Sequence, residues 1–257
     1  MLYKVVGFLL LFYSPYSDAL FSKLEISMVA THLEHFIEYD HHGAIDLLMA
    51  DIAHSSGIDH QYSVLSFARA RRSFLRKKIS CVLPASNLPF ITDSQKTIQS
   101  LPIATKQFRV YTLKDNEPVM NRVSLDNKVI GVVKNALPNY KELLRDNQAK
   151  IIEVSNFKAL IELLYKGRID AMIQDSASVN TLLSSEQKRA LFFDPTLDFI
   201  VDEIKITCHK NHATELYINS INHAILNMES KTIQHYFNQM SSKTSINASN
   251  ADSPNAA

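Results

Sequence analysis

Residues 155–176, SNFKALIELLYKGRIDAMIQDS, predict one half of an α/β domain. Ser155 can cap a helix, because its side-chain oxygen accepts a hydrogen bond from an unpaired N–H group of the first turn. Gly167 stands where this helix should stop, since only Gly adopts the left-handed cap conformation at little cost. The apolar residues of the expected helix recur at helical spacing; they are Phe157, Leu160, Ile161 and Leu164.

A short apolar run, Ile169 to Ile173, follows the glycine and is long enough for a buried strand but too short for a helix. The strand leads to Asp175 and Ser176, ahead of a second helix-like segment. Open α/β sheets bind ligands at the carboxyl ends of their strands, so Asp175 is a candidate ligand-binding residue. The alternative is that Asp175 caps the following helix. The sequence leaves both interpretations open.

The composition fits one or two globular domains with substantial cores. The chain has 257 residues and a formal net charge of +1, which gives no reason to expect nucleic acid as a partner. It contains only five Gly, and neither GxGxxG nor GxxxxGK occurs. We therefore expect no nucleotide site and no cofactor.

The first residues have the pattern of a signal peptide. Lys4 provides the positive region, Val5 to Tyr13 the short apolar region, and Ser17-Asp18-Ala19 a small-residue cleavage site. The alternative is a buried N-terminal strand or helix. No later stretch approaches the roughly 20 apolar residues of a membrane helix. We therefore expect cleavage after Ala19, a periplasmic location and no membrane insertion of the mature chain.

The rest of the chain alternates between strand-like and helix-like segments. Residues 84–99 have no apolar period, and the segment from Ser241 onward has the composition of a disordered tail. We expect strands over 24–30, 60–65, 79–83, 101–113, 128–133, 151–154 and 199–208, and helices over 43–53, 66–78, 135–144, 215–228 and 233–240.

An internal repeat supports two similar halves. Leu75 to Val82 parallels Leu164 to Ala171, each segment consisting of a helix end, a basic turn and a buried strand.

Residues 164–175, LYKGRIDAMIQD, resemble the signature of the periplasmic solute-binding proteins of family 3, the amino-acid-type receptors of ABC importers. The resemblance covers about residues 22–240. It implies an α/β, two-lobed type 2 periplasmic-binding fold, whose βαβ-type lobes are joined by crossing strands. The implied divisions are a signal peptide at 1–19, a first lobe at 20–105 and 204–240, a second lobe at 106–203 and a tail at 241–257.

The resemblance also implies a ligand cleft between the lobes, lined by loops at the carboxyl ends of the strands. Asp175 matches the acid that meets the ligand's amino group in this family, and the helix start at Asn135 suits an anionic ligand group. Core packing is the alternative for Phe36. The implied ligand-binding residues are Glu34, Phe36, Ser86, Asn135, Ala136 and Asp175.

One departure concerns the ligand. The family carries an Arg after the third strand that grips the ligand carboxylate, but residues 83–91 contain none, and the first following cation is Lys96. A standard α-amino acid is therefore in doubt, and we expect a small polar, amino-acid-like solute.

Six histidines precede residue 61, and we interpret them as solvated rather than as metal ligands, because no Cys lies near them. They are His32, His35, His41, His42, His54 and His60. The resemblance places Cys81 and Cys208 on neighbouring strands. Two alternatives remain for this pair: a disulfide, or two buried free thiols. No catalytic triad can be singled out.

Three functions remain in competition. The first is a monomeric periplasmic receptor that closes on its solute and serves an ABC permease. The second is an enzyme of the dehydratase kind on the same scaffold, with Glu34 or Asp175 as the acid–base group. The third is an orphan sensory or interaction protein that has lost transport. The sequence favours the receptor.

Overall fold

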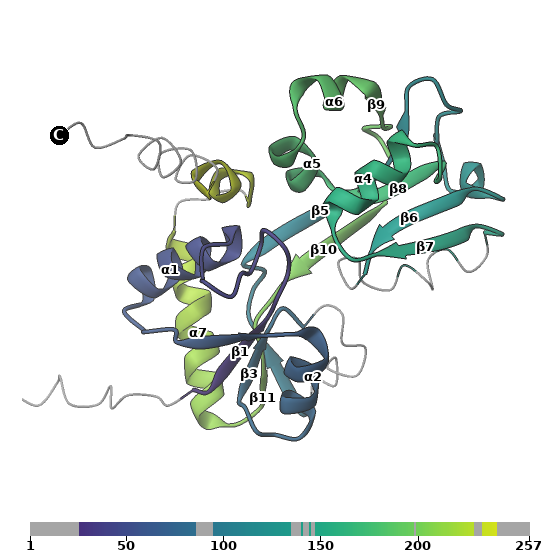
Figure 1. Cartoon of the computed structure of the whole chain (residues 1–257). Coiled ribbons are helices and arrows are strands. Elements are labelled where there is room, and N and C mark those ends of the chain that lie inside the picture. The colour runs from purple at the N-terminus through teal and green to yellow at the C-terminus, as the bar shows by residue number, and fades with distance from the viewer. Residues whose placement is uncertain are drawn as a thin grey trace, which may run out of the picture.

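The structure of the protein is a computed structural model that describes residues 26–85, 95–134, 140, 144, 147–197, 199–228 and 233–240. The expected signal peptide, the expected tail and most of the expected helix over 135–144 lie outside these residues. Two separate sheets form the frame of the molecule, one in each lobe (Figure 1). The two-lobed α/β architecture expected from the sequence is therefore confirmed.

The sheet of the first lobe has its parallel strands at one side and its antiparallel strands at the other. Its order is β2 (Tyr62–Leu65), β1 (Met28–Thr31), β3 (Cys81–Leu83), β11 (Thr207–His209) and β4 (Thr97–Gln99). Helices α1 (Ala44–Ser56) and α7 (His212–Asn227) and the helix over 233–240 share the core on one face, and α2 (Phe67–Leu75) covers the other. Alternate residues of β1 point to these two cores, as the two-residue period of a strand requires.

The sheet of the second lobe has the order β10 (Ile200–Ile204), β5 (Ala104–Leu113), β8 (Ala171–Asp175), β6 (Val129–Val133) and β7 (Lys150–Val154), with β9 (Leu191–Phe192) paired to β5. Strands β6, β7 and β8 run parallel, so their carboxyl ends lie at one edge. Helix α4 (Phe157–Tyr165) packs against this sheet, followed in the chain by α5 (Ser176–Leu182) and α6 (Ser185–Ala190); a short 3-10 turn covers Val123–Leu125.

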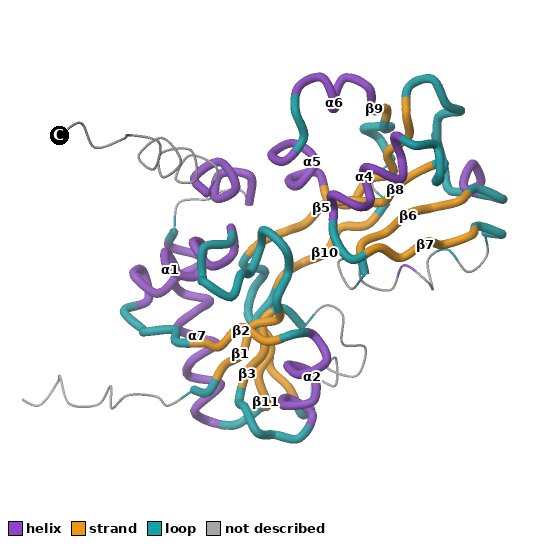
Figure 2. Tube along the Cα trace, viewed as in Figure 1, coloured by secondary structure: helices purple, strands orange, loops and turns teal. Residues whose placement is uncertain are grey.

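Strands β5 and β10 connect the lobes. They pair antiparallel from Ala104–Ile204 to Phe108–Ile200, and the two segments continue into the first sheet through the bond from Ser100 N–H to Ile206 O at 2.9 Å. Figure 2 shows these strands passing from one lobe to the other. They are the crossing strands that the resemblance implies, and they fall within the expected strand segments 101–113 and 199–208.

The internal repeat is present, displaced by one residue from the alignment expected from the sequence. Lys77 and Gly167 hold the same position one residue after the helix cap, with φ of 52° and 63°. The N–H of Lys77 donates to Phe74 O at 2.8 Å, and that of Gly167 donates to Leu164 O at 3.0 Å. Residue numbers in the two units therefore differ by 90.

Two local expectations were wrong by one or two residues. Asn156, not Ser155, caps α4, since its side chain accepts from Ala159 N–H at 2.8 Å. Strand β8 begins at Ala171 rather than Ile169, because Asp170 still belongs to the turn and accepts a bond from Val129 N–H at 2.7 Å. Residues 84–99 also end in β4, a strand that their irregular pattern did not predict.

Cys81 and Cys208 face each other across β3 and β11 and form a disulfide, which resolves the alternative left open by the sequence. Both side chains are fully buried. The bond joins residues 127 positions apart and fastens the strand that returns from the second lobe into the first sheet.

Candidate functional site

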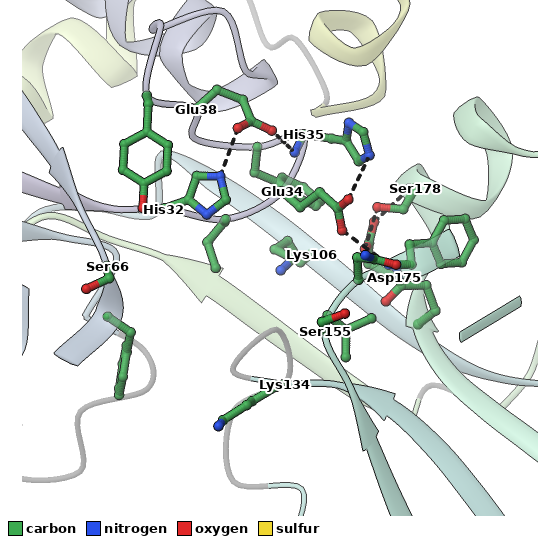
Figure 3. A pocket seen from close by; sticks show the side chains of 18 residues that line it. His32, Glu34, His35, Glu38, Ser66, Lys106, Lys134, Ser155, Asp175 and Ser178 are labelled. Atoms are coloured by element: carbon green, nitrogen blue, oxygen red, sulfur yellow. Dashed lines mark hydrogen bonds and ion pairs between the residues drawn. The ribbon is translucent and has the colours of Figure 1, made fainter. Parts of the chain in front are cut away.

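A cleft of about 620 Å³ lies where the carboxyl ends of the parallel strands of both lobes face each other. The first lobe lines it with the loop after β1 and the start of α2, and the second lobe lines it with the residues after β6, β7 and β8. Figure 3 shows the lining side chains. This is the edge at which open α/β sheets bind ligands.

The loop after β1 is held in a fixed shape by Glu38. Its carboxylate accepts bonds from the His35 N–H at 2.6 Å and from the ring of His32 at 2.9 Å. The loop also packs tightly on the start of α1, where a Cβ at Gly43 would lie 2.4 Å from the Phe36 carbonyl oxygen. Only Gly permits this approach, so the loop is a rigid wall of the cleft.

Glu34 reaches across the cleft from this loop to the second lobe (Figure 3). Its Oε2 accepts a bond from the Phe157 N–H at 3.2 Å, and its Oε1 lies 3.8 Å from Nε2 of His35. Phe157 is the first residue of α4, where free N–H groups and the helix dipole favour an anion. The carboxylate of Glu34 thus bridges the two lobes.

Phe36 combines both roles that the sequence left open. Its ring packs edge-on against Phe237 in the core of the first lobe, and the residue is only 3% exposed. It also lines the cleft, where the ammonium of Lys106 lies 4.4 Å from the ring centroid. Phe36 is therefore a core residue that reaches the floor of the cleft.

Asp175 lines the cleft and also caps α5, the alternative that the sequence left open. Its two oxygens accept from the N–H and the hydroxyl of Ser178, each at 2.7 Å. The residue is 3% exposed. The structure therefore places Asp175 in both positions that the sequence left open, at the cleft wall and at the cap of α5.

Lys106 is a buried cation that the sequence analysis did not identify. It lies on β5 with Asp175 and Asp202 nearby and packs between the rings of Phe36 and Phe108. Burial lowers the pKa of this ammonium, while the charges of the two aspartates raise it. The signal was available, since Lys106 shares the inward face of β5 with Phe108 in a two-residue period.

Three further polar residues line the cleft from the second lobe, one after each parallel strand or near its end: Lys134 after β6, Ser155 after β7 and Gln174 in β8. They share one edge, because Lys134 N–H donates to Val154 O at 2.9 Å and Val132 pairs with Ile173. Gln174 is 4% exposed, and its Oε1 has no hydrogen-bond partner among the described residues.

The structure brings together three of the six expected ligand-binding residues: Glu34, Phe36 and Asp175 all line the cleft. The other three, Ser86, Asn135 and Ala136, lie outside the described residues. Sequence reasoning missed Lys106, Lys134 and Gln174. Lys134 and Gln174 stand at strand ends, which the expected strands could have indicated.

The histidines do not all fit the expectation of solvated side chains. His60 is partly buried beside Tyr217, whose hydroxyl lies 3.2 Å from its Nδ1. Burial lowers the pKa of His60 to about 4, so that it is neutral at physiological pH. Among the described residues, no group of three or more His, Cys, Asp or Glu side chains could hold a metal ion.

No family model matches the sequence, and neither does any curated protein. Solved structures do match. The GluR0 ligand-binding core in complex with L-glutamate has a TM-score of 0.66 at 17% identity, over 84% of this chain and 97% of that one. An arginine third transport system periplasmic binding protein from Legionella pneumophila has a TM-score of 0.58 at 18% identity, over 85% and 98%.

The substrate-binding protein of an amino acid ABC transporter also matches, with a TM-score of 0.56 at 12% identity over 85% of this chain and 97% of that one. These likenesses establish the fold. The chain has the two-lobed architecture of type 2 periplasmic-binding proteins, and the three matched structures are binding proteins. In the part of the chain that is described, no helix is both long and apolar enough to cross a bilayer.

Proposed function

We propose that this protein is an exported receptor that binds a small polar solute in the cleft, closes around it and delivers it to an ABC permease. The observation that carries the proposal is the cleft itself, where the carboxyl ends of parallel strands from both lobes face each other. A solute held by both lobes stabilises the closed state, because only that state makes all the contacts.

The connection between the lobes supports such a movement. The chain passes between them in β5 and β10, and we propose lobe boundaries at residues 105/106 and 203/204. The bond from Phe157 N–H to Glu34 already links the two walls at 3.2 Å, which marks one point of contact between the lobes. We further propose that residues 1–19 direct export and that the mature protein works as a monomer.

The matched structures agree with a binding function, since one is a substrate-binding protein of an amino acid ABC transporter and another a glutamate-binding core. The enzyme alternative would need Glu34 or Asp175 as a proton-transfer group. Both carboxylates already accept hydrogen bonds from the protein, Glu34 from Phe157 N–H and Asp175 from Ser178. The binding interpretation is therefore supported by the matched structures, and turnover of the bound compound is the observation that would favour the enzyme.

A thermal-shift screen of the mature protein against amino acids, organic acids, sugars and polyamines tests the proposal. A ligand at about 100 times its Kd adds roughly 2.7 kcal/mol to the free energy of unfolding. We expect at least one class of compound to raise the melting temperature of the protein. We also expect the concentration of the stabilising compound to remain constant during incubation. Consumption of the compound would instead identify an enzyme. Uptake of the labelled compound by cells with and without the gene tests the transport role.

A further inference from the structure

The carboxylates of the cleft all have partners within the protein. Glu38 accepts from the His35 N–H and the His32 ring, and Glu34 accepts from the first N–H of α4. Asp175 accepts twice from Ser178 and lies within the field of Lys106. Each carboxylate that lines the cleft among the described residues therefore already accepts at least one hydrogen bond from the protein.

Lys106 stands beside Asp175, the acid that the family resemblance assigns to the ammonium group of an amino-acid ligand. It is buried, lines the cleft and is attracted by Asp175 and Asp202. A second ammonium brought to Asp175 would meet this lysine at short range, and like charges in a poorly solvated site repel strongly. The negative charge of Asp175 is therefore already balanced by the ammonium group of Lys106.

The polar groups that remain lie along the edge of the second sheet. Among the described residues, the side chains of Lys134 and Ser155 make no hydrogen bond or ion pair, and both are exposed toward the cleft. Gln174 differs from them, because its side chain is almost fully buried and no described residue hydrogen-bonds to its Oε1. A buried acceptor of this kind destabilises the protein unless a donor reaches it.

The pair Lys134 and Ser155 can bind one group of a ligand, and the Gln174 amide can bind a different group of the same ligand. A lysine without a counter-ion attracts an anion, and the Ser155 hydroxyl can donate to the same group. Rotation of the buried Gln174 side chain into the cleft would let its unsatisfied amide oxygen accept from a ligand, and a neutral hydroxyl supplies the donor without bringing charge close to Lys106. We propose that the cleft selects a small hydroxy acid, with its acid group at Lys134 and Ser155 and its hydroxyl at Gln174. This inference rests on the proposed receptor function and names the class of its solute.

Matched pairs of ligands test the inference by isothermal titration calorimetry of the mature protein. Each pair is an L-amino acid and the 2-hydroxy acid that differs only at the ammonium, beginning with L-glutamate and L-2-hydroxyglutarate and with L-arginine and argininic acid, and continuing through the standard amino acids. We expect the hydroxy acid of the best pair to bind at least about tenfold more tightly than its amino acid. The deoxy acid, such as glutarate, should lose a similar factor.

Two variants connect this preference to the named residues. Lys134→Met should weaken binding of the hydroxy acid by about tenfold or more, while Lys158→Met, which removes an exposed lysine of α4 outside the cleft, should leave it unchanged. Gln174→Met fills similar space without the amide and should abolish the difference between hydroxy and deoxy acid. Ser155→Ala, at an exposed position that cannot disturb the core, provides a further test and should lower the affinity for both acids alike.

The failures are distinguishable. Tighter binding of the amino acid in every pair would overturn the hydroxy-acid inference and leave the receptor function intact. Unchanged affinity in Lys134→Met, or an undiminished hydroxyl preference in Gln174→Met, would also overturn it. Binding by no compound of the paired panel overturns the inference, and if the broader thermal-shift screen is negative as well, the receptor function falls with it.

Discussion

At the end of β8 the chain carries Gln174 and Asp175, whereas the corresponding residues at the end of β3 are Pro84 and Ala85. The units that lead to these two ends are alike. Helix α2 and β3 in the first lobe, and α4 and β8 in the second, share the left-handed turn residue and the hydrogen bonds around it. The repeated unit therefore builds the frame of both lobes, and among the described residues it ends in polar side chains in the second lobe only.

The first lobe compensates from a different element. Apart from Ser66 before α2, its polar cleft residues come from the loop after β1, where Glu38 fixes the shape and Glu34 reaches the second lobe. The comparison teaches that similarity of backbone does not carry similarity of chemistry. The following predictions test how much particular residues contribute to the stability of the protein in each lobe.

The largest effect should come from Lys106, the buried cation on the strand that joins the lobes. Lys106→Met leaves Asp175 and Asp202 without this charge, and breaking such a buried arrangement costs about 3–5 kcal/mol. Urea unfolding measures the loss, with Lys158→Met as an exposed control that should change stability by less than about 0.5 kcal/mol. A loss below about 1 kcal/mol for Lys106→Met would show that the aspartates do not need it.

The disulfide is a device of the first lobe alone. The double substitution Cys81→Ala and Cys208→Ala should lower the free energy of unfolding by about 2–4 kcal/mol, because it releases a loop of more than a hundred residues in the unfolded chain. Reduction of the wild-type protein should give a similar loss, and the double variant should not respond to the reductant. Free thiols in the unfolded, unreduced protein would contradict the bond.

Asp175 should prove structural as well as functional. Asp175→Ala removes the cap of α5 and a carboxylate near Lys106, at an expected cost of about 2 kcal/mol in the ligand-free protein. Ser184→Ala, which removes the exposed cap of α6, should cost no more than about 1 kcal/mol. Equal costs for the two variants would mean that Asp175 is an ordinary cap without electrostatic weight.

The smallest effects on stability should come from substitutions at the two turn residues, Gly167 and Lys77, and these effects should have opposite signs. Gly167→Ala forces a Cβ into the left-handed region and should destabilise the protein by about 1 kcal/mol. Lys77→Gly relieves the same conformation in the first lobe and should stabilise it by about 0.5 kcal/mol. No atom lies within 4 Å of a Cβ built at Gly167, so packing does not obscure the backbone term. Chemical denaturation of both variants measures the change in the free energy of unfolding. Changes of the same sign would contradict the equivalence of Lys77 and Gly167 in the repeat.

Much of the frame could be predicted from the sequence. Gly167 marks the end of α4 because no other residue adopts that turn as easily, and the apolar runs mark the strands because they are buried on both faces. Lys77 in the same conformation gave no such signal, and the repeat was therefore aligned one residue out of register.

The site could be predicted only in part. Asp175 and Phe36 were expected at strand ends, but a sequence does not show whether a carboxylate turns toward a ligand or toward the next helix. Lys106 and Gln174 belong to the site because they are buried and because of the groups around them. Burial and neighbouring groups both depend on contacts between distant segments of the chain. Long-range contacts of this kind leave only a weak trace in the local pattern.

The central claim is that the two lobes close on a solute, and a distance between them tests it most directly. Asp40→Cys and Lys158→Cys place spin labels at exposed positions of the first and second lobes, and the native cysteines are engaged in their disulfide. Pulsed electron paramagnetic resonance then compares the protein alone with the protein saturated by the compound of largest thermal shift. We expect the distance distribution to become shorter and narrower with the compound. An unchanged distribution at saturation would contradict closure around the solute.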